Sequence, residues 1–244
     1  MSGGRKPPPL LVFTGPGTAR AAAPWRAAAE RRGWRTELRP ITRTVPVEIA
    51  AGAVDRAPPA WVAVTSPNAL PALQRLWQGR PELRLVPHAA LGAALGKRLA
   101  EAGVEPALVA AGSGIADASA LATEIVAAST TGDRVLWPRG ERAEDLRDAL
   151  VGAGRYVQAP IAYRSERSAE FRPPEAAAAV FFASPESAGA WLERSDVPRT
   201  TAIAIGPSTH AELAPAYARF VRVVRLAQPR PDDLERVLVE LPVG

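Results

Sequence analysis

The sequence predicts an α/β fold made of two similar three-layer α/β/α domains, each with a parallel sheet. Short apolar runs of strand length alternate with helix-length segments along the chain, as is typical of parallel sheets covered by helices. The stretch VFFASPESAGAWL at residues 180–192 is echoed by WVAVTSPNAL at residues 61–70. Each copy is followed by an apolar run that ends at a glycine, Gly92 or Gly206. We interpret this echo as an internal duplication.

Turn and cap residues set the expected ends of the elements. Glycine closes the helices that end before Gly33 and Gly103, as is usual at helix C-termini. Asp232 and Asp233 lie in the first turn of the last helix, where acidic side chains are favourable. The expected strands are residues 10–13, 34–41, 61–64, 107–110, 134–137, 180–182, 203–205 and 221–226. The expected helices are residues 19–32, 71–77, 118–128, 145–151 and 231–241, with further helices after Gly92, Ser184 and Gly206.

Three stretches have a less definite pattern. Residues 46–54 could form a short helix, and residues 83–86 a short strand or loop segment. Residues 156–164 are extended but contain Pro160. Since proline cannot donate a hydrogen bond to a sheet, this run is expected to be an edge strand or a linker.

Ser66-Pro67 and Ser184-Pro185 form the same corner after the two echoed strands. Serine is a favoured N-cap, and proline suits the first helical position because an N–H there would be unpaired. The helix that follows directs free N–H groups and the positive end of its dipole beyond the strand. Such a corner can bind an anion, and its ordinary role is to cap the helix.

Composition narrows the function. The 244 residues are 47% hydrophobic and 23% charged, as in an ordinary globular protein. The absence of cysteine excludes disulfides and thiolate catalysis. The net charge of +5 is compatible with an anionic ligand, while the lack of a recognised nucleic-acid motif argues against a nucleic-acid partner. No run is long enough for a signal peptide or a membrane span. We therefore expect a cytoplasmic protein without a membrane partner, and a monomer.

Cofactor and catalytic motifs are incomplete in this chain. The Gly15-x-Gly17 loop has Arg20 where a dinucleotide fingerprint needs its third glycine, and the Gly112 loop has Asp117 there. No G-x-S-x-G elbow occurs, so Ser184 is a poor candidate for a nucleophile. The protein is therefore expected either to bind a ligand or to catalyse a reaction that needs positioning more than acid–base groups.

Seven segments together resemble one family. They are VAVTSPNAL, ALGAALGKRLAEAGV, VLWPRGE, APIAYRSE, VFFASPESAG, AIGPSTHAEL and LAQPRPDDLERVL. In this order, over nearly the whole chain, they resemble uroporphyrinogen-III synthase. The resemblance implies a discontinuous first domain, residues 1–40 plus 165–244, and a second domain, residues 43–158. It also implies a two-stranded connector at residues 40–43 and 158–165.

The resemblance implies an enzyme that uses no metal or cofactor. Its reaction closes the linear tetrapyrrole hydroxymethylbilane into uroporphyrinogen III, with loss of water and inversion of the last pyrrole ring. The hydroxyl leaves to give an azafulvene, and attack by the substituted carbon of the terminal ring gives a spiro intermediate that fragments and recloses. Since the bilane closes unaided to the uninverted isomer, the protein must mainly select the attacking carbon by positioning. The acetate and propionate arms make the substrate a polyanion, which helix N-termini suit.

The resemblance also implies a substrate site in the cleft between the domains. Tyr163 matches a connector tyrosine thought to help the hydroxyl leave, directly or through water. The expected substrate-binding residues are Thr65, Ser66, Asn68, Gly92, Arg139, Ser184, Ser187, Gly206, Ser208 and Thr209. The chain departs from the family at Leu95, where a threonine is usual, and at Gly15, where an arginine is common.

Two other functions stay open at this stage. A two-domain protein that binds or senses a small ligand could keep the fold and lose the reaction. A nucleotide-dependent enzyme could use the loops at Gly15 or Gly112. The isomer formed from hydroxymethylbilane distinguishes the synthase from both.

Overall fold

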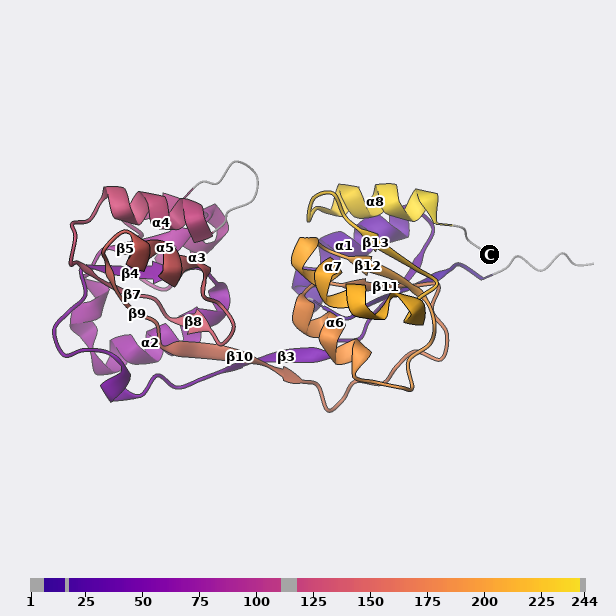
Figure 1. Ribbon diagram of the computed structural model, residues 1–244, viewed down its shortest axis with the longest axis horizontal. Helices are drawn as coiled ribbons and strands as arrows, with labels where there is room; N and C mark the ends of the chain where they lie inside the picture. Colours follow the sequence, from indigo (N-terminus) through magenta and orange to yellow (C-terminus); the bar gives the residue numbers. More distant parts are fainter. Residues whose placement is uncertain (1–6, 16–17, 111–117, 242–244) are drawn as a thin grey trace, which may run out of the picture. The chain divides into compact units, whose positions relative to one another are not determined.

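The chain forms two compact units, each with its own parallel sheet. The computed structural model describes residues 7–15, 18–110 and 118–241. The first unit is Met1–Arg43 with Ser165–Gly244, and the second unit is Thr44–Arg164 (Figure 1). The strand order is β13-β12-β11-β1-β2 in the first unit and β6-β5-β4-β7-β9 in the second. All neighbouring strands in these two sheets are parallel.

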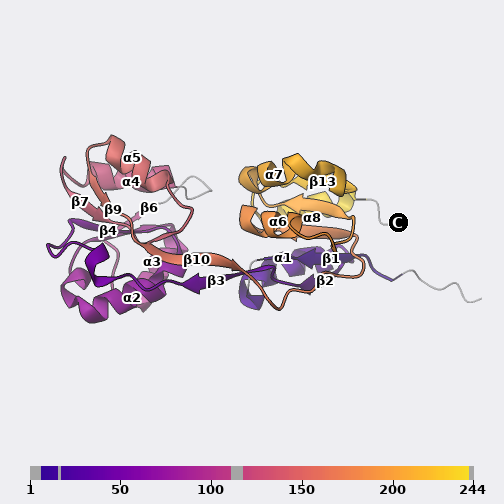
Figure 2. The same cartoon turned by 60° about the horizontal axis from the view of Figure 1, so that its bottom comes forward.

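In the first unit two helices cover each face of the sheet (Figures 1 and 2). Its strands are β1 (Leu10–Phe13), β2 (Arg35–Leu38), β11 (Ala179–Phe182), β12 (Thr201–Ala204) and β13 (Arg222–Arg225). Its helices are α1 (Ala19–Arg31), α6 (Pro185–Leu192), α7 (Pro207–Leu213) and α8 (Pro231–Glu240), with a 3₁₀ turn η4 (Ala214–Arg219). Val12 and Val180 pack under α6 and α7, whereas Phe13 and Phe181 pack under α1 and α8. Alternate residues of each strand therefore pack into two separate cores, one on each face of the sheet.

The second unit has the same three layers. Its strands are β4 (Trp61–Val64), β5 (His88–Leu91), β6 (Leu108–Ala110), β7 (Arg134–Leu136) and β9 (Tyr156–Gln158). Its helices are α2 (Leu70–Gly79), α3 (Ala93–Glu101), α4 (Ala118–Ala127) and α5 (Asp145–Gly152), with 3₁₀ turns η1 (Ala51–Ala53), η2 (Pro67–Ala69) and η3 (Pro81–Arg84). Val62 and Val64 pack with α2 and α3, while Ala63 packs with α4 and α5.

A third, small sheet contains the two strands on which the chain passes from one unit to the other. It has the order β3-β10-β8, with β3 (Thr42–Pro46), β10 (Ile161–Arg167) and β8 (Arg139–Gly140). Both boundaries between the units fall within β3 and β10. Pro160 separates β9 from β10.

The two units share one topology with different chain ends. The second unit runs β4-α2-β5-α3-β6-α4-β7-α5-β9, and the first, read from β11, runs β11-α6-β12-α7-β13-α8 and then β1-α1-β2. The first unit is thus a circular permutation of the second, with the chain ends between α8 and β1. The predicted fold class is confirmed: two similar parallel-sheet domains, a two-stranded connector and a discontinuous first domain.

The structure excludes a helix in one of the less definite stretches and a strand in another. Residues 46–54 are not a helix, because β3 extends to Pro46 and only the short turn η1 follows. Residues 83–86 are not a strand, because η3 continues to Arg84. Pro81 begins this turn, and the Arg80 guanidinium holds it by donating to the carbonyl oxygens of Asp55 and Arg56, at 2.6 and 2.9 Å.

Candidate functional site

The carboxyl ends of the parallel strands bring the candidate residues of each unit to one edge of its sheet. In the second unit the chain runs from β4 to β5 on one side and returns through β7 on the other. The strand order therefore reverses between β4 and β7. Crevices at such reversals are the usual ligand sites of open parallel sheets. Thr65 and Ser66 follow β4 there, and Trp137 follows β7.

Internal donors fix two hydroxyls at this corner. The buried Trp137 indole Nε1–H donates to Thr65 Oγ1 at 3.0 Å. The backbone N–H of Asn68 donates to Ser66 Oγ at 3.2 Å, which caps η2 at the start of the helical segment. Each hydroxyl accepts one bond and keeps its own hydrogen to donate. The Asn68 side chain is exposed.

Tyr163 lies beside the same corner. In the small sheet it is paired with Gly140, and its ring packs with Ala69 and Ala72 at the start of the helix after Ser66. A Cβ atom at Gly140 would lie 2.8 Å from Tyr163 Cζ, so the ring rests directly on the glycine. Segments 65–69, 137–140 and Tyr163 therefore converge within the second unit.

The sequence predicts Tyr163, Thr65 and Ser66 as site residues, whereas Trp137 and Gly140 are found only in the structure. A tryptophan at the carboxyl end of a strand, followed by Pro-Arg-Gly, was the available signal. The sequence does not indicate which hydroxyl accepts from this indole N–H, because the partner, Thr65, is 72 residues away.

Arg139 does not have the free guanidinium that the expected role requires. Its side chain is only 14% exposed and pairs with Glu144 at 3.0 Å. It also donates to four backbone carbonyls, those of Ala159, Gly140, Glu141 and Ala143. We assign Arg139 to holding the β8 turn rather than to a substrate carboxylate.

Gly92 forms a second corner of this unit, at the start of α3. Its φ of 84° and ψ of 153° are strained for other residues, which explains the glycine. Ala93 and Ala94 are exposed in the first turn, whereas Leu95 is buried. This corner can offer backbone N–H groups but no hydroxyl at position 95.

The Ser184 corner of the first unit is a complete capping box. Ser184 Oγ accepts from the Ser187 N–H at 3.2 Å, and Ser187 Oγ accepts from the Ser184 N–H at 3.3 Å. Ser187 also donates to the Ser184 carbonyl at 2.8 Å and is 1% exposed. The expected substrate-binding role of Ser187 does not fit this geometry, because its hydroxyl is buried and engaged. Ser184 keeps its hydroxyl hydrogen, as Ser66 does.

Gly206 is the N-cap of α7, beside that corner. It is in extended backbone, and a Cβ there would meet nothing within 4 Å. Ser208 is exposed, while Thr209 is 1% exposed. Thr209 Oγ1 has no hydrogen-bond partner among the described residues. An unpaired buried hydroxyl is costly, so the Thr209 hydroxyl is one of the buried polar groups for which a ligand or a water would supply the missing partner.

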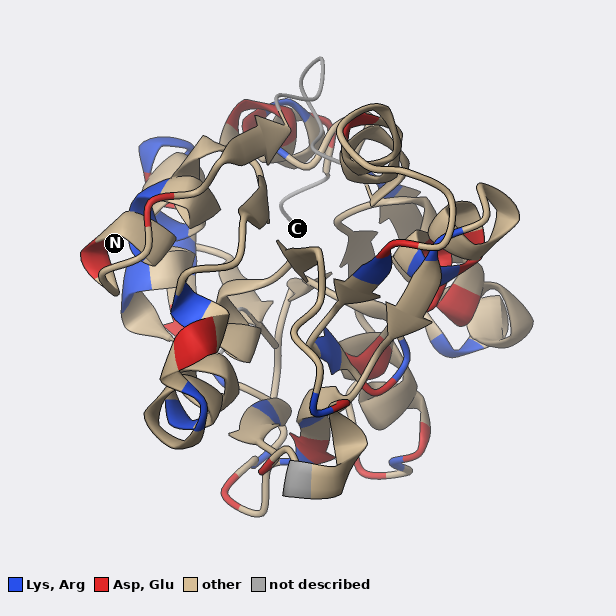
Figure 3. Ribbon diagram, turned by 90° about the vertical axis from the view of Figure 1, so that its left-hand side faces the viewer, with Lys and Arg blue, Asp and Glu red and all other residues tan. Residues whose placement is uncertain are grey.

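Among the described residues, charged residues and side chains able to hold a metal ion are not concentrated at the strand-end corners. Lys and Arg lie interspersed with Asp and Glu in Figure 3. Within residues 7–15, 18–110 and 118–241, no group of three or more His, Asp or Glu could hold a metal ion. The helices of the same ranges are all too short or too polar to cross a membrane.

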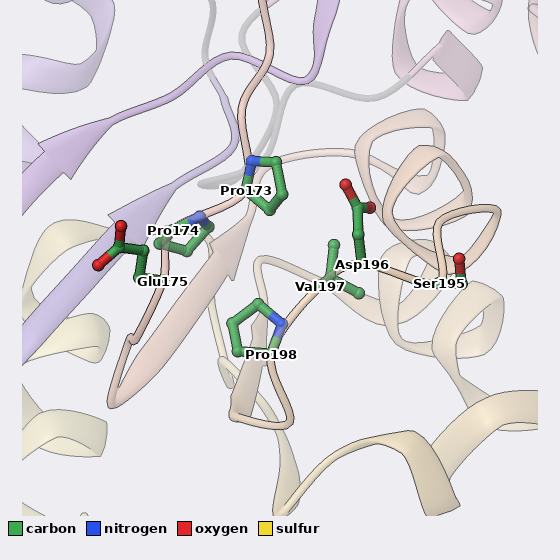
Figure 4. Close-up of a pocket in the computed structure, with 7 residues that line it drawn as sticks. All are labelled: Pro173, Pro174, Glu175, Ser195, Asp196, Val197 and Pro198. Carbon is green, nitrogen blue, oxygen red and sulfur yellow. The ribbon is translucent and has the colours of Figure 1, made fainter.

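A hollow of about 430 Å³ lies at the opposite edge of the first unit's sheet (Figure 4). Its lining comes from residues 173–175 before β11 and residues 195–198 before β12, and the rings of Pro173, Pro174 and Pro198 face it. Asp196 is already paired with Arg194, whose Nε donates at 2.8 Å. The hollow is thus at the amino ends of the strands, away from the Ser184 corner, and we give it no part in the site.

A family model described as uroporphyrinogen-III synthase HemD matches residues 23–232. The chain belongs to the uroporphyrinogen-III synthase family. The resemblance carried by the seven ordered segments is therefore confirmed, and with it the assignment to an enzyme family of tetrapyrrole biosynthesis. Nothing found favours a binding or sensor protein.

A solved structure supports the fold of this uroporphyrinogen-III synthase family member. A mutant uroporphyrinogen III synthase from the extremely thermophilic bacterium Thermus thermophilus matches with a TM-score of 0.56 at 19% identity, covering 95% of this chain and 98% of that chain. The wild-type enzyme of the same organism matches with a TM-score of 0.45 at 21% identity, over 93% and 95% of the two chains. Comparison with curated proteins finds no match.

Proposed function

We propose that this chain converts hydroxymethylbilane to uroporphyrinogen III and that the carboxyl-edge corners bind carboxylate arms of the substrate. The observation that carries the proposal is the convergence of Thr65, Ser66 and Tyr163 at the point where the strand order of the second unit reverses. Family membership supplies the reaction and the tetrapyrrole substrate.

The binding groups are hydrogen-bond donors rather than charges. Thr65, Ser66 and Ser184 each accept an internal N–H bond and have a hydroxyl hydrogen left for a carboxylate. The exposed Asn68 and Ser208, the buried Thr209, and the helix starts after Gly92 and Gly206 would add further donors. A hydrogen bond to a charged group contributes about 1.5–3 kcal/mol. Several such bonds can hold a flexible bilane in the conformation that places the substituted carbon for attack.

Tyr163 is proposed to assist departure of the hydroxyl. Its ring is held on Gly140 beside the corner, and its own hydroxyl has no hydrogen-bond partner among the described residues. It would donate a hydrogen bond, directly or through water, to the oxygen that leaves as water. The pyrrole nitrogen supplies the electron pair as the C–O bond breaks and loses its N–H proton, so that the hydroxyl leaves as water and the neutral azafulvene remains.

The test is turnover of enzymatically generated hydroxymethylbilane, with separation of the type I and type III isomers. The wild-type chain is expected to give the type III isomer. Tyr163→Phe is expected to lower turnover by roughly 10- to 100-fold, the loss of one hydrogen bond to a group that develops charge, and to leave product affinity intact, because the ring packing is kept and only the donor is lost. Tyr156→Phe is the matched control, since Tyr156 is 70% exposed at the start of β9.

Each other outcome would overturn a different part of the proposal. A wild-type chain that gives only type I product would not be a synthase, and tight binding without turnover would point to a ligand-binding protein. A wild-type rate for Tyr163→Phe would remove Tyr163 from the mechanism.

We also propose that the enzyme works in the cytoplasm as a monomer without a nucleic-acid partner. The family's place in tetrapyrrole biosynthesis and the interspersed basic and acidic residues of Figure 3 support this. Light scattering on the purified chain, with and without added nucleic acid, tests both the monomer and the missing partner.

A further inference from the structure

The hydrogen bond between Trp137 and Thr65 fixes the direction of one hydroxyl in the candidate site. An indole N–H can only donate, so Thr65 Oγ1 is the acceptor in their 3.0 Å contact. The hydroxyl hydrogen must then point away from Trp137. Thr65 is half-buried and donates to no other group among the described residues. Its remaining hydrogen is available to an acceptor from outside the protein.

The first unit shows that the fold does not need this polar pair. With Ser66 aligned on Ser184, Thr65 corresponds to Ala183. The strand registers, Val62 with Leu136 and Val12 with Val180, then align Trp137 with Phe13. Phe13 and Ala183 belong to one apolar cluster. The same position in the same topology is therefore filled without any hydrogen bond.

We propose that Trp137 is a positioning residue that holds the Thr65 hydroxyl as a hydrogen-bond donor to a carboxylate arm of the substrate. The inference rests on the proposed function, since it needs Thr65 to contact substrate. Trp137 is 1% exposed and acts through Thr65 rather than by touching the substrate. Without the indole N–H, the Thr65 hydroxyl can rotate so that an oxygen lone pair faces the substrate carboxylate. The lone pair and the negative carboxylate repel each other, and the hydrogen bond to the substrate is lost.

The experiment measures KM and kcat for hydroxymethylbilane in Trp137→Phe, Thr65→Val and the double variant. Trp137→Phe is expected to raise KM by about 3- to 10-fold with kcat nearly unchanged, the pattern for loss of uniform binding. In the Thr65→Val background the same change should have no further effect on KM. A structural role for Trp137 would instead give the same effect in both backgrounds.

Trp77 offers a matched control in the same unit. It is also buried, at 3% exposure, but its Nε1 has no hydrogen-bond partner among the described residues. Trp77→Phe therefore removes an indole N–H that makes no hydrogen bond, and the KM for hydroxymethylbilane should stay at the wild-type value. A rise in KM equal to that of Trp137→Phe would overturn the inference.

The hydrogen bond from Trp137 to Thr65 can also be tested without substituting Trp137, by measuring hydrogen exchange of the indole N–H. Slow exchange of the Trp137 indole proton is expected in the wild type and in Thr65→Ser, and faster exchange in Thr65→Val. An unprotected indole proton in the wild type would overturn the inference even if Trp137→Phe failed to fold. If Thr65→Val raises KM and Trp137→Phe does not, the positioning role of Trp137 is wrong while the proposed contact of Thr65 with substrate stands. If Thr65→Val leaves KM unchanged while type III isomer still forms, both the proposed contact of Thr65 with substrate and the positioning role of Trp137 are wrong.

Discussion

His88 lies in the core of the second unit with one ring nitrogen unpaired. Its Nδ1 is 2.6 Å from the carbonyl oxygen of Val86, which can only accept, so Nδ1 carries the proton. Nε2 is buried and has no partner among the described residues, and the Trp77 ring packs edge-on at 5.5 Å between centroids. Burial lowers the pKa of His88 below 6.5, against a smaller opposite effect of the Val86 hydrogen bond. The folded chain therefore holds His88 neutral.

This neutral histidine predicts a loss of stability in acid. In the unfolded chain His88 has its ordinary pKa of 6.5, so below that pH the unfolded state binds the extra proton and the folded state does not. The free energy of unfolding should fall as pH drops below 6.5, by at most about 1.4 kcal/mol per pH unit, until the folded histidine is itself protonated. Urea denaturation of the wild type and of His88→Leu between about pH 7.5 and about pH 5 measures this; parallel pH dependences would contradict it.

At the scale of elements, the two-residue strand β8 supports Tyr163 of β10. The Glu141 N–H donates to the Tyr163 carbonyl at 3.2 Å, and the guanidinium of Arg139 fixes the turn that follows. Gly140 leaves the space in which the tyrosine ring lies. A small residue at this position thus connects the packing of β8 and β10 to the placement of the proposed hydrogen-bond donor.

Gly140→Ala should therefore lower both stability and turnover. The added Cβ would lie 2.8 Å from Tyr163 Cζ and 2.9 Å from its hydroxyl oxygen, so the ring must move or the strands must separate. Overpacking of this kind typically costs about 1–3 kcal/mol. Gly152→Ala in α5 is the control, because a Cβ there meets nothing within 4 Å. Urea denaturation and the type III assay measure the two effects; a Gly140→Ala enzyme with wild-type turnover would show that the position of the ring is unimportant.

The elements that were predicted correctly have local causes, and the others do not. The Ser184-Pro185 and Ser66-Pro67 corners depend on residues within one turn, and the structure has helical segments beginning at both. Strand β3 depends on pairing with β10, more than a hundred residues later, so no local pattern at residues 42–46 indicated it. Arg139 has the residue type expected for a carboxylate ligand, but its partners include the distant Ala159 carbonyl.

On the scale of the whole molecule, each unit has its own cores. Every described hydrophobic cluster draws its residues from one unit alone. The permuted order of elements explains how the first unit can be interrupted by the second: the chain leaves and rejoins the first unit through β3 and β10, beyond the five-stranded sheet. The first unit therefore has a complete sheet and two cores without any residue of the second.

The topology therefore predicts that the first unit folds in permuted form. In the second unit, residues 128–133 join α4 to β7. A linker of that length should likewise join α8 to β1, in a chain that starts at Ser165, ends at Arg43 and lacks residues 44–164. We expect this chain to unfold cooperatively in urea, because its stability comes from cores that contain no residue of the second unit, with a denaturant slope roughly half that of the full chain. Residues 44–164 alone are the matching control. A permuted chain with helical circular dichroism but no cooperative transition would mean that the first unit depends on contacts with the second.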